Sequence, residues 1–285
     1  MAVIAFICKT SDEHAVKQGE IFAHRLTQVG HRVLGEPHLH VSGVEPVKKL
    51  EDLVDQSDLL FVFGGDGTLL YAASLMTRRV IPIVGINLGS LGFLTPFSPA
   101  SAQDSLHEIL TGRLPIVDRL RFSAVLLRDG VPVFSTVAAN DVVINHENLA
   151  RLLEITCEID SEPFFTLKAD GLILATPMGS TAYALAAGGP ILRPGMDAMV
   201  VVPICPHQLT QRPMVIPASS EIILSTGQDG FLTVDGRRGC TIRRKDRLWV
   251  TVSDLPLRMV LPHNYSFASV LRHKLSWGAR GEDHA

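Results

Sequence analysis

The first hundred residues alternate between short apolar runs and longer segments with helical spacing. Apolar runs at Val3–Cys8, Leu59–Phe63 and Val80–Ile86 predict three strands. Strands separated by helical segments form parallel sheets with helices packed on their faces. We therefore predict an α/β domain at the start of the chain, with ligands bound beyond the carboxyl ends of its strands.

Helix signals lie between these runs. Ser11 is positioned to cap a helix that ends at Gly30, and Pro46 is placed as an early residue of a second helix. A third helix is expected from about Thr68 and a fourth near Ala100–Leu110.

From about Asp118 the pattern changes to short β-rich runs separated by turns such as Asp129-Gly130. We predict an all-β, sandwich-like second domain over 118–261, with one helix inserted at Thr181–Ala187. A last helix at Ser266–Trp277 is expected to join the first domain, so that 1–117 with 262–277 forms the α/β domain and 278–285 a flexible tail. The runs predicted as strands are 121–127, 131–137, 152–159, 164–167, 172–175, 199–204, 221–224, 231–234 and two within 248–261.

Composition narrows the class of protein. The chain has 285 residues, of which 46% are hydrophobic, so a substantial core is available. Its 26 basic and 29 acidic residues give no support for nucleic-acid binding, and the short Arg243–Arg247 cluster is best explained as a solvated hairpin. No apolar run reaches the ~18 residues of a membrane span, and the N-terminus lacks the basic lead-in of a signal peptide. With four scattered cysteines and no C-x-x-C pair, we expect a cytoplasmic protein with free thiols.

The segment Gly64-Gly-Asp-Gly-Thr68 follows a predicted strand and precedes a predicted helix. Bare glycine amides and the positive end of a helix suit a phosphate group. Asp66 should repel a phosphate, so its presence indicates a group that handles a proton or a metal ion beside the phosphoryl group. The loop therefore predicts phosphoryl transfer. The alternative is a simple connector, since the segment matches neither G-x-G-x-x-G nor a P-loop.

Two further segments carry ligand-binding signals. Residues 170–190 are rich in small side chains around a single Tyr183, which would let the backbone lie flat against a planar ligand. Asn140 can both donate to and accept from an adenine or amide edge, and Asp141 can accept from ribose hydroxyls. The alternatives are a helix cap at Ser180 and Thr181, and a turn at Asn140-Asp141.

Together these segments closely resemble the bacterial NAD kinases, over nearly the whole chain. Gly64–Thr68 alone is also found in diacylglycerol-type lipid kinases and 6-phosphofructokinases, whereas the block Ala169–Tyr183 is more particular to NAD kinases. The motifs that carry the resemblance are Gly64–Thr68, Asn87–Phe93, Asn140-Asp141, Ala169–Tyr183, Leu185–Pro190 and Pro203–His207.

The resemblance implies an α/β N-terminal domain and a β-sandwich C-terminal domain. It implies Mg²⁺-dependent transfer of the terminal phosphate of ATP, or of polyphosphate, to the 2′-hydroxyl of the adenosine ribose of NAD, which gives NADP. It also implies a homo-oligomer, a dimer or tetramer, with pockets completed by a neighbouring subunit. Small molecules would be its only other partners, with neither nucleic acid nor membrane bound.

The resemblance also assigns roles to residues. Asp66 would accept the proton and contact NAD, Gly67 would lie beside the nucleotide, and Mg²⁺ would be held mainly by the donor phosphates. Arg151 and Lys168 would be basic partners of the pyrophosphate or the incoming phosphate, with a weaker match at Arg237. The family more often has Glu at the position of Asp141. The phosphate-donor loop would be Gly64, Gly65, Gly67 and Thr68, and the NAD pocket would further include Asn140, Asp141, Asp170, Thr181, Ala182, Tyr183, Ala184, Leu185 and Ala186.

Two other functions stay open. One is a different kinase of the GGDGT group that acts on a lipid or a sugar phosphate; a lipid is disfavoured because the sequence has no membrane-binding apolar helix or long basic run. The other is a non-catalytic regulator that binds NAD, against which Asp66 argues, because binding alone gains little from a carboxylate beside a phosphate.

Overall fold

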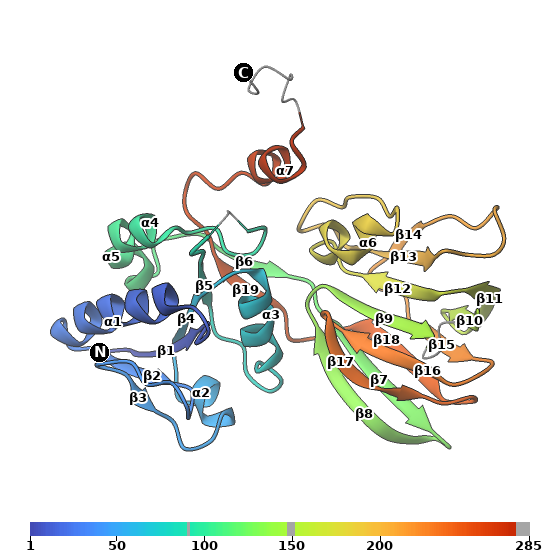
Figure 1. Ribbon diagram of the computed structural model, residues 1–285, viewed down its shortest axis with the longest axis horizontal. Helices are drawn as coiled ribbons and strands as arrows, with labels where there is room; N and C mark the ends of the chain where they lie inside the picture. Colours follow the sequence, from blue (N-terminus) through green and yellow to red (C-terminus); the bar gives the residue numbers. More distant parts are fainter. Residues whose placement is uncertain (90–91, 147–151, 278–285) are drawn as a thin grey trace. The chain divides into compact units, whose positions relative to one another are not determined.

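The computed structural model describes residues 1–89, 92–146 and 152–277 (Figure 1). The chain forms two compact units. The first contains Met1–Asp118 and the segment that begins at Arg258, and the second contains Arg119–Leu257.

The first unit is built on a seven-stranded sheet with the order β3-β2-β1-β4-β5-β19-β6. Each neighbouring pair from β3 to β19 runs parallel. The chain passes from β1 to β2 and β3 on one side, then returns to β4 on the other side of β1. The strands are β1 (Val3–Cys8), β2 (Arg32–Gly35), β3 (Glu45–Pro46), β4 (Leu59–Phe63), β5 (Ile83–Ile86), β6 (Ile116–Arg119) and β19 (Leu257–Val260).

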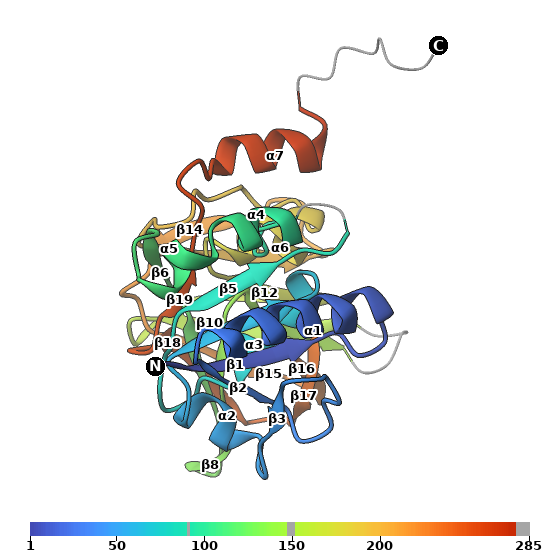
Figure 2. The same cartoon turned by 90° about the vertical axis from the view of Figure 1, so that its left-hand side faces the viewer.

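Helices cover both faces of this sheet. On one face, Phe22 of α1 packs against Phe61 and Phe63 of β4, with ring centroids 5.9 and 5.3 Å away, and α1 lies lengthwise along β1 (Figure 2). On the other face, Leu69 of α3 lies so close to Gly85 that a Cβ there would be 2.7 Å from it. The helices of this unit are α1 (Glu13–Gln28), α2 (Glu51–Asp55), α3 (Asp66–Ser74), α4 (Pro99–Asp104), α5 (Leu106–Leu110) and α7 (Phe267–Leu275).

The second unit is a β-sandwich of two six-stranded antiparallel sheets, with the orders β11-β10-β15-β18-β7-β8 and β14-β13-β12-β9-β16-β17. Alternate residues of both sheets, such as Leu126 of β7 and Leu174 of β12, form one buried core. The strands are β7 (Phe122–Arg128), β8 (Val131–Ala138), β9 (Asp141–His146), β10 (Leu153–Ile159), β11 (Glu162–Ala169), β12 (Gly171–Ala175), β13 (Ala198–Ile204), β14 (Met214–Pro217), β15 (Ile222–Thr226), β16 (Gly230–Val234), β17 (Arg237–Ile242) and β18 (Arg247–Val252).

The segment between β12 and β13 covers the outer face of the second sheet. It contains a 3₁₀ turn at Gly179–Thr181 and the short helix α6 (Tyr183–Ala186), drawn beside β12 and β13 in Figure 1. Ala184 packs there against Ile173 and Val200. These central strands are therefore buried on both faces, which explains why they are apolar at every position rather than at every second one.

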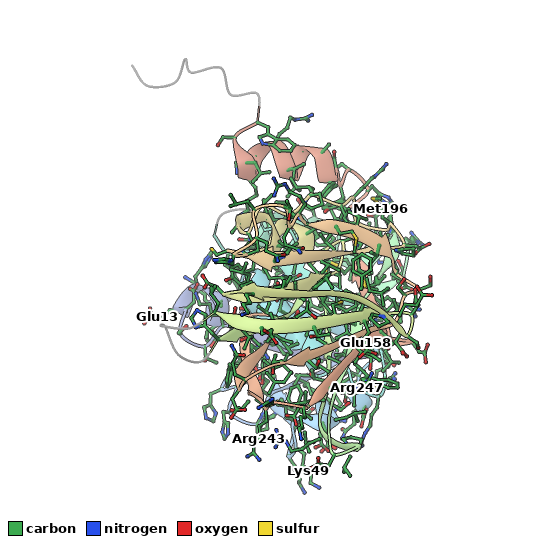
Figure 3. All side chains as sticks on the ribbon, turned by 90° about the vertical axis from the view of Figure 1, so that its right-hand side faces the viewer. Glu13, Lys49, Glu158, Met196, Arg243 and Arg247 are labelled. Atoms are coloured by element: carbon green, nitrogen blue, oxygen red, sulfur yellow. The ribbon has the colours of Figure 1, made fainter. Side chains whose placement is uncertain are left out.

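The basic cluster at 243–247 lies at the turn between β17 and β18, but it is not the predicted hairpin, because these two strands belong to different sheets. Asp246 is buried and accepts hydrogen bonds from Nε and Nη2 of Arg128 at 3.0 and 2.7 Å. Arg247 forms an ion pair with Glu158 at 2.8 Å, and both side chains are labelled in Figure 3. The cluster is accordingly part of the sandwich's own packing.

Several predicted elements differ from the structure. The cap of α1 is Asp12, whose side chain accepts from the amide of His14, and not Ser11. Pro46 lies in the edge strand β3, where its missing N–H costs nothing, and the helix expected there is confined to α2. The helix expected near 100–110 is divided into α4 and α5.

Among the described residues, six strands were missing from the prediction: β2, β3, β6, β9, β14 and β17. The two strands predicted within 248–261 lie in different sheets, since β18 belongs to the sandwich and β19 to the parallel sheet. Within the described residues, no helix has the length and apolar character needed to span a membrane.

Candidate active site

The glycine-rich loop joins β4 to α3 in the first unit. Helix α3 begins at Asp66, two residues earlier than predicted, with Gly65 as its N-cap. A Cβ at Gly64 would lie 2.8 Å from Cβ of Thr68, so this glycine allows the loop to turn tightly. Cβ atoms at Gly65 and Gly67 would meet nothing within 4 Å. The backbone at these two positions is therefore open to a ligand, at the end of α3 where amides lack intrahelical acceptors.

Asp66 is anchored by a second loop of the same unit. Its Oδ2 accepts a hydrogen bond from the amide of Phe93 at 2.9 Å, and its Oδ1 accepts from the amide of Leu94 at 3.0 Å and from the hydroxyl of Thr95 at 3.2 Å. Asn87 donates from Nδ2 to the Thr95 hydroxyl at 2.8 Å, so that hydroxyl directs its own proton to Asp66. Asp66 is thus fixed in orientation before any ligand binds.

Gly92 makes this arrangement possible. A Cβ at Gly92 would lie 2.9 Å from Cγ of Asp66, and closer still to Oδ1 of Asp66 and Oγ1 of Thr95. In the sequence, the motif Asn87–Phe93 is part of a second glycine-rich loop after a predicted strand, and it also carries the resemblance. In the structure it supplies the glycine that lets the Asp66 carboxylate approach the backbone of residues 93 and 94.

A pocket of about 720 Å³ borders the glycine-rich loop, within the first unit. Its lining includes Gly65, Gly67 and Thr68 together with Glu36 and Leu39. Asp66 is not among its lining residues. The Asp66 carboxylate is therefore held by residues 93–95 and does not form part of the pocket lining.

In the second unit, the carboxylate of Asp235 fixes the backbone of the second candidate site. Asp235 accepts hydrogen bonds from three consecutive amides, those of Ala139, Asn140 and Asp141, at 2.8, 2.7 and 3.0 Å. Asp235 and Gly236 have positive φ values of 49° and 70°, as the two-residue hairpin between β16 and β17 requires. The turn between these strands thus fixes the start of β9.

Burial and charge change the chemistry of Asp141. Burial, with a smaller contribution from the neighbouring charge of Asp235, raises the pKa of the Asp141 carboxyl from 3.8 to about 7. Burial also raises the pKa of Asp235, against the lowering effect of its three amide donors and of Arg237. Within the described residues, the Asn140 Oδ1 is buried with no hydrogen-bond partner. A buried acceptor without a hydrogen-bond donor lowers the stability of the fold, unless a ligand donates a hydrogen bond to it.

The small-residue segment lies directly against Asn140. Thr176 donates from its amide to the Asn140 carbonyl at 2.9 Å and from its hydroxyl to the Ala139 carbonyl at 2.6 Å. A Cβ at Gly179 would be 2.8 Å from Cα of Asn140, so only glycine allows this contact. Tyr183 follows with 44% of its surface exposed. The structure therefore brings Asn140 and Asp141 together with the segment that leads into Thr181–Ala186.

The other predicted NAD-site residues lie elsewhere in the sandwich. Asp170 and Lys168 are at the opposite end of β12, where Asp170 is 3.8 Å from Nε2 of His146 and Lys168 is 3.8 Å from Glu154. The five residues of β12 separate the two ends, roughly 16–17 Å at the usual strand rise. Arg237 lies on β17 near Asp235. Arg151 lies outside the described residues.

Sequence reasoning gave no role to Asp235, Thr95 or Thr176. The Asp235-Gly236 pair carried only a hairpin signal, and its partners are about a hundred residues away along the chain, at separations of 94 to 96. Thr95 lies just beyond the motif Asn87–Phe93. Thr176 lies within the motif Ala169–Tyr183, where nothing in the sequence distinguishes it from its neighbours.

Mg²⁺ finds no ready set of carboxylate, histidine or cysteine ligands in the described part of the chain. The described residues contain no group of three or more His, Cys, Asp or Glu placed to hold a metal ion. Both oxygens of Asp66 already accept hydrogen bonds. Mg²⁺ keeps several waters and is often bound through substrate phosphates, so the expectation that the donor phosphates would hold it stays a prediction.

Comparison with known proteins identifies the family. The family model of the ATP-NAD kinase N-terminal domain matches residues 4–114, and that of the ATP-NAD kinase C-terminal domain matches residues 139–261. An NAD kinase of Geotalea daltonii is 39% identical over 98% of this chain and 100% of its own length. An NAD kinase of Aromatoleum aromaticum is 45% identical over 84% of this chain and 80% of its own length.

Solved structures agree. The crystal structure of yeast NADH kinase complexed with NADH is similar with a TM-score of 0.92 and 25% identity, over 98% of this chain and 88% of that chain. An NAD kinase from Archaeoglobus fulgidus in complex with ATP has the same fold, with a TM-score of 0.76 at 24% identity over 97% and 99% of the two chains. The matches span the α/β unit and the β-sandwich, and the chain belongs to the NAD kinase family.

Proposed function

We propose that this NAD kinase transfers the terminal phosphate of ATP to the 2′-hydroxyl of the adenosine ribose of NAD, with Asp66 as the proton acceptor. The observation that carries this proposal is the environment of Asp66. A carboxylate beside a phosphate-binding loop serves binding poorly, but it suits a reaction in which a hydroxyl must lose its proton.

The hydrogen bonds of Asp66 leave one position for that hydroxyl. A carboxylate has about four lone-pair sites on its two oxygens. Oδ1 accepts two hydrogen bonds and Oδ2 accepts one. Counting the contacts of the described residues, the free site is therefore on Oδ2, where we place the 2′-hydroxyl. Because a carboxylate is a weak base towards an alcohol, proton transfer is late and follows a largely dissociative phosphoryl transfer.

The glycine-rich loop supplies the phosphate subsite. Its open positions at Gly65 and Gly67 precede α3, whose positive end favours a terminal phosphate. Thr68 and Lys9 also line the adjoining pocket. Amides and an ammonium group neutralise charge on the transferring group, which is the main requirement of phosphoryl transfer.

The NAD subsite is assigned to Asn140, Asp141 and the segment Thr181–Ala186. The unpartnered Oδ1 of Asn140 suits the amino group of an adenine, and the carboxyl of Asp141 suits a ribose hydroxyl. The relatives' complexes with NADH and with ATP support nucleotides of both kinds as ligands of the family. Assignment of individual residues of this chain to NAD is our proposal.

Asp170 and Lys168 are assigned to the pocket of a neighbouring subunit. They lie at the far end of β12 from Asn140, so one copy does not bring all the predicted residues together within the sandwich. In a homo-oligomer, Asp170 and Lys168 of one copy would complete the pocket that Asn140 and Asp141 form in another copy. Both groups of predicted residues would then belong to one NAD site. Mg²⁺ delivered with the donor phosphates and a cytoplasmic location stay predictions of the same proposal.

The experiment is NADP formation measured in parallel with ATP, other nucleoside triphosphates and polyphosphate, with NAD as acceptor. We expect NADP with ATP and its loss in Asp66→Ala, with Asp12→Ala as the matched control because Asp12 only caps α1. Phosphorylation of a lipid or a sugar phosphate in preference to NAD would favour another GGDGT kinase. Binding of NAD without product under every donor would favour a regulator.

A further inference from the structure

The pocket beside the glycine-rich loop is larger than a phosphate group needs. Its volume of about 720 Å³ lies within the range of sites for drug-sized ligands. It is formed by the carboxyl ends of β1 and β2 and by the loop after β4, all within the first unit. Because the chain leaves β1 towards β2 and later returns to its other side as β4, this is the point where the strand order reverses. Open α/β sheets bind nucleotides at such points.

The pocket lining includes a carboxylate and apolar side chains. Glu36 follows β2 directly, and its Oε1 accepts a hydrogen bond from the hydroxyl of Tyr71 at 2.7 Å. Tyr71 lies on α3, four residues after Gly67, so one helix carries both the open glycine and the hydrogen-bond partner of Glu36. Leu39 and Leu50 add apolar surface beside Glu36.

The Glu36 carboxylate is suited to hydroxyl groups rather than to phosphates. Burial raises the pKa of Cys8 to about 12, so the thiol at the end of β1 is a neutral part of the lining. Burial also raises the pKa of Glu36, against the lowering effects of the Tyr71 hydroxyl and of His38. In nucleotide-binding α/β folds, an acidic residue in this kind of position accepts hydrogen bonds from ribose hydroxyls.

We propose that this pocket holds the nucleoside of a nucleoside triphosphate donor, with its ribose hydroxyls on Glu36 and the carboxylate oriented by Tyr71. The donor's terminal phosphate then lies at Gly65 and Gly67, so the inference rests on the proposed function and names its donor. A polyphosphate chain would place negative charge beside Glu36 and gain nothing from the apolar lining. The Glu36 carboxylate therefore favours binding of the nucleotide and disfavours binding of polyphosphate.

The variants that test this are Glu36→Gln and Tyr71→Phe. The amide of Gln keeps the size of the side chain and can still accept from Tyr71, but it loses the charge-assisted bond to a ribose hydroxyl. We expect KM for ATP to rise roughly 10-fold in Glu36→Gln, the usual difference between charged and neutral hydrogen bonds. Tyr71→Phe should act in the same direction but more weakly. Glu20→Gln, an exposed position on α1, is the matched control.

Substrate analogues test the same contact in the unaltered protein. We expect 2′-deoxy-ATP or 3′-deoxy-ATP to be a poorer donor than ATP by roughly 10-fold or more, since the analogue leaves Glu36 without its partner. In Glu36→Gln the ratio of the activity with ATP to the activity with a deoxy analogue should fall towards one. Use of polyphosphate should be unchanged or increased in Glu36→Gln, and KM for NAD should not move.

Three results would overturn the inference: equal use of ATP and both deoxy analogues, an unchanged KM for ATP in Glu36→Gln, or an equal loss with ATP and polyphosphate. Calorimetric binding of a non-hydrolysable ATP analogue to the unaltered protein and to Glu36→Gln provides a readout without turnover. If no donor gives NADP, the proposed reaction fails, and this binding measurement still decides whether the pocket recognises a nucleoside through Glu36.

Discussion

Substitution of Gly92 tests how Asp66 is positioned without changing a polar group. In Gly92→Ala the new Cβ would lie 2.9 Å from Cγ of Asp66, whereas carbon atoms in contact are usually about 3.5–4.0 Å apart. The Asp66 side chain must therefore move by about 1 Å, away from the amides of Phe93 and Leu94. A displacement of about 1 Å at a reacting group costs roughly 10²-fold in rate, or about 2.7 kcal/mol of barrier.

Gly89→Ala is the matched control for this prediction. It lies in the same loop, and the nearest atom to its new Cβ is the Asn87 Oδ1 at 4.0 Å, an ordinary contact. Both substitutions restrict the unfolded chain to the same extent, so their comparison isolates the clash. The assay is turnover at saturating NAD and ATP, with a thermal melt to confirm folding. A folded Gly92→Ala protein within about three-fold of Gly89→Ala would refute the positioning argument.

Three further predictions concern carboxylates. Asp66→Asn should lower turnover by roughly 10²–10⁴-fold, and also lower the melting temperature, because an amide has one acceptor oxygen for the two amides of Phe93 and Leu94; turnover within a few-fold of the parent would show that Asp66 is not the base. Asp235→Asn should cost about 1–3 kcal/mol of unfolding free energy through an unpaired buried amide and weaken NAD binding by calorimetry, and unchanged affinity would contradict its role in fixing Asn140. In the folded protein the Asp141 carboxyl has a pKa of about 7, against an ordinary 3.8. Its contribution to the free energy of unfolding should therefore be complete below about pH 4 and be lost as the pH rises to about 7. The loss should be at most about 4 kcal/mol. Urea unfolding at pH 5 and pH 8 should show a smaller difference in Asp141→Asn than in the parent, and an equal difference would contradict the assignment to Asp141.

The elements around Asp66 were predictable because their sequence signals are local. Strands β1 and β4 are continuous apolar runs, as buried parallel strands require, and the glycines of the loop end one run and begin a helix. The error at Pro46 has a local cause as well. Proline is favoured in the first turn of a helix, but an edge strand two residues long accepts it equally well.

Strand β9 shows what local patterns omit. Val131–Ala139 reads as one strand and Asn140-Asp141 as the turn that ends it. The structure instead begins a central strand at Asp141, paired with β12 on one side and β16 on the other. Only partners distant in the sequence distinguish a strand start from a turn here. The role of Asp235 was hidden for the same reason, since it depends on a pairing across about 95 residues.

The two carboxylates that organise the candidate sites resolve a difficulty posed by the sequence. A negative charge at Asp66 should repel the phosphate that the neighbouring glycines are suited to bind. In the structure, the charge of Asp66 faces the donors of residues 93–95, and its side chain does not line the pocket beside the loop. Asp235 is held in the same way by three amides of residues 139–141. Fixed N–H dipoles disperse each charge and set its direction before a ligand arrives. A carboxylate can therefore stand next to a phosphate site, because the loop that restrains it determines which substrate atom meets its remaining lone pair.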